Sequence, residues 1–167
     1  MGKCQSFNCK HRQNVFHDFP PSQNFNDQHH FKLNLNGMPL KRVTSTKFLG
    51  IIIDEKLDWS LHINELCQVL RKNTGILYKL SQFIPQKFLK ILYSSLIHSK
   101  LLYGILLYAN TFPTYLHDLI ILNNRILRII QNKSRHDHTE DLYKTFHTLP
   151  IDLLFKSQLY SHANCLF

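Results

Sequence analysis

From Ser60 onward, apolar residues recur three and four positions apart, the spacing of a helix with one buried face. Ser60 is the expected N-cap of the first helix, Gly75 is a weak point inside it, and Pro85 ends it. A long helix with a single apolar face must bury that face against other elements, so the chain is constrained to a helical bundle. The face consists of Ile63, Leu66, Leu70, Leu77, Leu80 and Ile84.

The same spacing predicts four more helices, with a break at 110–113 and Pro150 between the last two. The expected ranges are about 86–108, 114–131, 139–148 and 151–163. The helix at 86–108 is expected to carry an apolar face of Leu89, Leu92, Leu96, Tyr103 and Leu106.

Before Ser60 the hydrophobic period is two, which is typical of strands. Phe31, Leu33 and Leu35 alternate with polar residues and are followed by Asn36-Gly37, the pair most suited to a tight hairpin turn. A buried strand is predicted at 48–53, with a polar turn at 54–58. Residues 1–30 show no sustained period and are expected to be a poorly ordered leader. The predicted fold class is mainly α: a helical bundle preceded by a small antiparallel β-hairpin and strand element.

The 167 residues carry a net charge of +9, concentrated in the middle of the chain. Residues 61–135 contain ten Lys or Arg but only two acidic residues, Glu65 and Asp118. Such a surface favours a polyanionic partner, although a solvated helical face would show the same composition. No apolar run is long enough for a membrane span, and the polar N-terminus argues against secretion. An intracellular protein with free thiols and no membrane partner is expected.

Metal binding and catalysis have little support in the residues. The spacing of Cys4, Cys9, His11 and His17 fits no common zinc site, so no metal and no cofactor are predicted. Neither a Ser/His/Asp nor a Cys/His arrangement is indicated, and no catalytic residue is assigned.

Four motifs carry a resemblance to a known family. They are Thr46-Lys-Phe-Leu-Gly-Ile-Ile-Ile-Asp54 with the following Leu57-Asp-Trp-Ser-Leu-His-Ile63, the Leu-Tyr-x-Ser-Leu-Ile and Tyr-Gly run of Leu89–Tyr108, Leu122-Asn-Asn-Arg-Ile-Leu-Arg-Ile-Ile130, and Thr148-Leu-Pro-Ile151. In this order they resemble the segment after the catalytic palm of reverse transcriptases from non-LTR (LINE-type, jockey-like) retrotransposons. The chain departs from the family pattern at Tyr108, Asn123 and Ile126, where Trp, Gln and Ala are usual.

The resemblance implies a division of the chain into four parts. Residues 1–30 would be the leader, 31–58 the edge of the palm, 59–133 a helical thumb-like domain that grips the template–primer duplex, and 134–167 a truncated helical linker. The chain stops in an apolar helical pattern, so an interrupted reading frame is expected. Polymerisation in this family needs an Asp-Asp pair that holds Mg²⁺, and this sequence contains no such pair. The chain alone is therefore predicted to be inactive, with Mg²⁺ expected only in the full-length parent RNA-directed DNA polymerase.

The resemblance also assigns site residues. Phe48, Leu49 and Gly50 would correspond to the strand that supports the primer end. A helical thumb would meet duplex phosphates, weakly and without sequence preference, through basic side chains. Those candidates are Arg71, Lys72, Lys79, Lys87, Lys90, Arg125, Arg128 and Lys133. His62 is expected at the surface or at a helix cap, and Tyr103 and Tyr108 in the core.

A second interpretation is a non-enzymatic helical interaction module, or a decaying transposon remnant without activity. Loss of the palm would leave apolar surface exposed, so self-association is expected on this interpretation.

Overall fold

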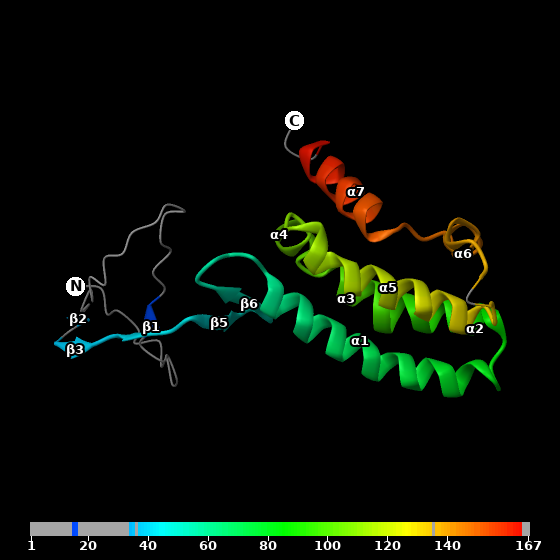
Figure 1. The fold of residues 1–167 in the computed structure, drawn as a ribbon, viewed down its shortest axis with the longest axis horizontal. Coiled ribbons are helices and arrows are strands. Elements are labelled where there is room, and N and C mark those ends of the chain that lie inside the picture. The colour runs from blue at the N-terminus through cyan, green and yellow to red at the C-terminus, as the bar shows by residue number, and fades with distance from the viewer. Residues whose placement is uncertain (1–14, 17–33, 36, 135, 165–167) are drawn as a thin grey trace, which may run out of the picture.

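The computed structural model describes residues 15–16, 34–35, 37–134 and 136–164 (Figure 1). Most of the predicted leader, and the predicted strand residues 31–33, lie outside the described residues. The described part is mainly α-helical, with a small antiparallel β element ahead of the helices, which confirms the predicted fold class.

The strands before the helices pair two by two. β2 (Asn34–Leu35) and β3 (Met38–Pro39) are antiparallel, with Leu35 opposite Met38, so they form the hairpin that the sequence predicts. Gly37 has a φ of 81°, the left-handed conformation that such a turn requires. β1 (Val15–Phe16) runs parallel to β4 (Lys41–Arg42).

The prediction of one buried strand at 48–53 is wrong. β5 (Ser45–Phe48) and β6 (Ile51–Asp54) form a hairpin in which Phe48 lies opposite Ile51. The chain reverses at Leu49 and Gly50, whose φ angles are 48° and 84°. Two successive left-handed residues make the tight turn that joins antiparallel strands, so the apolar run is folded back on itself.

The first predicted helix is present as α1 (Ser60–Ser81). Its buried residues include Ile63, Leu66, Leu70 and Leu77, as the spacing predicts. The N-cap prediction is wrong by one residue. Trp59 occupies the cap position with a left-handed backbone, and the Asp58 side chain accepts the Ser60 N–H at 2.9 Å.

The second predicted helix is broken into shorter pieces. α2 (Gln86–Tyr93) continues through the π-helical turn η1 (Ser94–His98) into α3 (Ser99–Leu102), and α4 (Ile105–Tyr108) follows Gly104. Gly104 has a φ of 72°, which ends α3. The predicted face is right in part: Leu89 is buried and Leu92, Leu96 and Leu106 are half-buried against the core, but the prediction for Tyr103 is wrong. The buried face is Leu89, Tyr93, Ile97, Leu101, Ile105 and Tyr108, while Tyr103 is exposed.

The remaining helices agree with the predicted ranges to within two residues. They are α5 (Pro113–Ile130), α6 (Thr139–Phe146) and α7 (Ile151–Asn164). α1 packs along α5 and α2, α5 packs on α6, and α4 on α7 (Figure 1). One hydrophobic core runs from α1 through α5 to Leu142, Phe146 and Leu154, so it is continuous across the predicted boundary at 133/134. That boundary stays a prediction. None of the described helices has the length and apolarity needed to cross a membrane.

Candidate nucleic-acid interface

The exposed side of α1 carries two of the predicted basic residues. Lys72 and Lys79 are both exposed, and seven residues place them about two turns apart on the side of α1 opposite its buried face. Glu65 lies on the same side, but Lys47 of β5 pairs with it at 2.6 Å. Neither Lys72 nor Lys79 has an acidic partner in the part of the chain that the structure describes. Both ammonium groups are therefore available to an anionic ligand.

The other predicted cations fall into different environments. Arg71, Lys87, Arg125 and Lys133 are exposed, and Lys90 is half-buried. Lys87 and Lys90 lie on α2, close to the turn after α1, and Arg125 lies on α5. Because Lys72 and Lys79 point away from the face of α1 that packs on α5, they do not share one contact surface with Arg125.

Arg128 is the candidate least available to a ligand. Its side chain is half-buried, and Nη2 donates to the backbone oxygen of Asp137 at 3.3 Å. The backbone N–H of Lys133 bonds to the Arg128 carbonyl at 2.9 Å. These contacts connect the end of α5 to the loop before α6. Arg128 therefore stabilises this connection, a role that the sequence pattern does not predict.

Phe48, Leu49 and Gly50 form the tip of the β5–β6 hairpin. Phe48 and Leu49 are exposed, while the Leu49 carbonyl accepts a hydrogen bond from the Tyr103 hydroxyl. A Cβ on Gly50 would lie 3.6 Å from the Tyr103 ring, which is ordinary contact distance. Tyr103, in the link between α3 and α4, therefore holds the hairpin turn in place. The side chains of Phe48 and Leu49 remain exposed at the tip.

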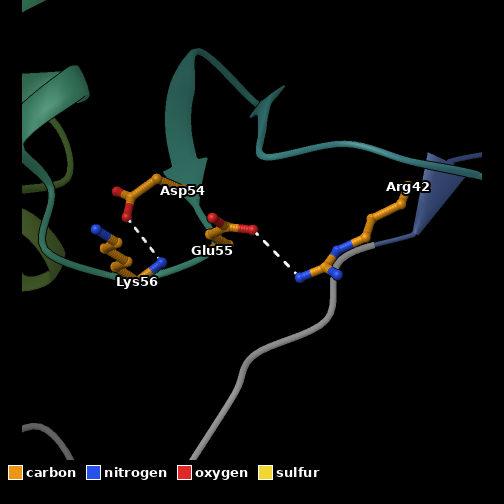
Figure 2. Close-up of polar contacts among 4 residues, drawn as sticks. All are labelled: Arg42, Asp54, Glu55 and Lys56. Atoms are coloured by element: carbon orange, nitrogen blue, oxygen red, sulfur yellow. Dashed lines mark hydrogen bonds and ion pairs between the residues drawn. The ribbon is translucent and has the colours of Figure 1, made fainter. Parts of the chain in front are cut away.

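The base of the hairpin is locked to α1 by a buried carboxylate. Asp54 Oδ1 accepts the backbone N–H of Lys56 at 3.0 Å (Figure 2). Oδ1 also accepts the N–H of Asp58 at 3.3 Å, and Oδ2 accepts that of Trp59 at 3.2 Å. Arg42 pairs with Glu55 at 3.5 Å beside it (Figure 2). Three donors on one carboxylate fix the path from strand to helix. The sequence offers only a weak signal for this role, a polar residue at the end of an apolar strand.

His62 adds a second contact between hairpin and bundle, and the prediction that it lies at the surface is wrong. Its ring is buried beside Tyr108, with centroids 5.4 Å apart, and Nδ1 accepts the Ile52 N–H at 3.4 Å. Burial lowers the pKa of His62, Glu65 raises it and Lys47 lowers it. A neutral ring that accepts at Nδ1 is consistent with this position.

The residues present do not fit the pair of metal ions that polymerisation uses. Asp54 is occupied by backbone donors, and the Asp58 carboxylate accepts the backbone N–H of Ser60. Within the described ranges, no three His, Cys, Asp or Glu side chains lie close enough to hold a metal ion. The site is therefore a candidate for binding, and no catalytic step is derived from it.

The chain is 28% identical over 116 residues to the RNA-directed DNA polymerase from mobile element jockey of Drosophila melanogaster. The match covers 66% of this chain and 12% of that protein, and it supports a relationship to non-LTR reverse transcriptases. No family model matches the chain. No solved structure matches it either.

Proposed function

We propose that this chain corresponds to the palm edge and thumb of a non-LTR retrotransposon reverse transcriptase, and that it binds template–primer duplex through its basic helices. The observation that carries the proposal is an uninterrupted cationic stretch. Residues 66–117 contain six Lys or Arg and no Asp or Glu, and they extend from α1 through α4 into the first turn of α5. The similarity to the jockey polymerase names the kind of polyanion that this stretch would meet.

Duplex binding needs cations on a rigid support. Lys72 and Lys79 lie on such a support, since the apolar face of α1 packs against α5, α2 and β6. Contacts of lysines with phosphates carry no sequence information, so the expected binding is weak and independent of sequence. Activity is not part of the proposal, because the chain has no Asp-Asp pair to hold Mg²⁺.

Reversal of charge on α1 tests the proposal. The double variant Lys72→Glu/Lys79→Glu is expected to weaken binding to a 16-bp RNA–DNA hybrid about tenfold or more at low salt, because two phosphate contacts become repulsive. Fluorescence anisotropy of a labelled hybrid measures the affinity. The matched control is Lys144→Glu/Lys156→Glu, which makes the same change in net charge on α6 and α7.

The affinity of the control double variant for the hybrid is expected to stay within about twofold of the wild-type affinity, because its changes alter only the net charge. Equal weakening by both double variants would show that only total charge matters, and the α1 surface would lose its assignment.

A second candidate function has one observation in its favour. Large apolar side chains are exposed on the hairpin tip and on α7, including Phe48, Leu49 and Tyr160. A helical interaction module that associates with itself would use such surface. On this alternative, light scattering shows oligomers, and neither double variant changes binding because the hybrid is not bound.

A further inference from the structure

The turn between α1 and α2 holds an apolar side chain away from the core. This turn, residues 82–85, lies at the end of the bundle opposite the β5–β6 hairpin (Figure 1). The Leu80 carbonyl accepts the N–H groups of both Phe83 and Ile84 at 3.0 Å. Leu80 and Ile84 pack against the core, and Phe83 is left 83% exposed. The exposure of the ring is therefore imposed by an ordered backbone.

Apolar and cationic side chains lie close to Phe83 in the sequence, on the last turn of α1 and along α2. Phe88 and Ile91, three residues apart on α2, are both exposed and share one side of the helix. Lys87 Nζ lies 5.0 Å from the centroid of the Phe88 ring. Lys79 belongs to the last turn of α1. We call this surface the elbow; it consists of Lys79, Phe83, Lys87, Phe88, Lys90 and Ile91.

The elbow is cationic as well as apolar. None of its three lysines has an acidic partner in the described part of the chain. Acidic residues at this end of the bundle belong to the loop before α6 and to its first turn. Asp137 there accepts the Ser134 N–H at 2.7 Å, and Glu140 lies 3.9 Å from Lys144. An occupant of the elbow must therefore offer negative charge and flat apolar faces together.

We infer that the elbow binds unpaired nucleotides of a template or primer strand, with a base stacked on Phe83 and neighbouring phosphates on Lys79 and Lys87. The inference rests on the proposed nucleic-acid binding and extends it to a second class of strand. In a duplex the bases already stack on one another, so an exposed phenyl ring has little to contact. In a single strand the base faces are free, and aromatic rings with nearby lysines are the usual way to hold them.

The test uses the full chain with a labelled 12-nucleotide DNA and with the RNA–DNA hybrid. Phe83→Ala is expected to weaken single-strand binding about tenfold, the effect of losing one stacked base, and to change hybrid binding less than twofold. The matched control is Phe112→Ala, since Phe112 is 68% exposed but lies at the start of α5, the opposite end of the bundle. A 2-aminopurine base in the strand reports stacking directly, because its fluorescence is quenched by the wild type and recovers with Phe83→Ala.

Three results would overturn the inference. If Phe83→Ala binds the single strand as the wild type does, while the hybrid is still bound, the elbow is wrong and the proposed function stands. If neither nucleic acid is bound with salt sensitivity, both proposals fail. If Phe83→Ala instead leaves binding to both nucleic acids unchanged and lowers the amount of protein that co-sediments with phosphatidylserine-containing vesicles, the elbow is a membrane-contacting surface.

Discussion

Replacing Asn123 with leucine is expected to lower the free energy of unfolding by about 3 kcal/mol, because it removes the centre of a buried polar network. Asn123 is 0% exposed. Its Oδ1 accepts the Tyr93 hydroxyl at 3.1 Å, and its Nδ2 donates to the Tyr143 hydroxyl at 3.2 Å. One amide thus joins α2, α5 and α6. An apolar side chain in its place removes the acceptor of the buried Tyr93 hydroxyl, while the Tyr143 hydroxyl keeps only its bond to Asn124 Oδ1.

The phenols in this network stay protonated through the ordinary range of pH. Burial raises the pKa of Tyr143 to about 12, and burial raises the pKa of Tyr93 as well. Both groups therefore donate hydrogen bonds, and the effect of Asn123→Leu is expected to be the same at pH 6 and pH 8.

Urea denaturation followed by circular dichroism measures the effect of Asn123→Leu. Asn64→Leu is the matched control, since Asn64 is an exposed residue inside α1 and its replacement should change stability by only about 0.5 kcal/mol. A midpoint for Asn123→Leu equal to that of the control would mean that the network contributes no stability.

Gly104→Ala is expected to cost about 2 kcal/mol of stability. The φ of 72° penalises any residue with a Cβ by about 1 kcal/mol. That Cβ would also lie 2.6 Å from Cδ1 of Ile51, a buried residue of β6, which must then move. The change acts on the contact between the α3–α4 link and the hairpin.

Gly75→Ala is the control for Gly104→Ala, and it should change stability in the opposite direction. Gly75 lies inside α1 with nothing within 4 Å of an added Cβ, so alanine is expected to stabilise the helix by about 1 kcal/mol. Thermal unfolding of the two variants side by side gives the comparison. Stabilisation by both would show that Gly104 is not held in a left-handed conformation.

Local pattern was enough to predict most of the helices. α1, α5, α6 and α7 each have an apolar face at regular spacing and a proline or polar boundary, so their ranges follow from the sequence. The hairpin at 45–54 does not follow in the same way. Leu49 has no local preference for a φ of 48°, and its turn is stabilised by the Tyr103 hydroxyl from far along the chain.

In the candidate interface too, local pattern predicts some features, while others depend on tertiary contacts. Exposure of Lys72 and Lys79 follows from their place opposite the apolar face of α1. The hydrogen bond of Arg128 to the Asp137 carbonyl and the burial of His62 under the hairpin depend on tertiary contacts. The exposed ring of Phe83 was also missed, because a periodic apolar pattern does not distinguish a core residue from one held outward by a turn.

The salt dependence of hybrid binding by the wild-type chain tests the central claim most directly. Anisotropy titrations of the 16-bp RNA–DNA hybrid between 50 and 300 mM salt give the affinity at each concentration. If the basic helices contact about four to six phosphates, the logarithm of the affinity falls linearly with the logarithm of salt concentration, with a slope of about −4. Undetectable binding at 50 mM, or an affinity that does not change with salt, would contradict the account.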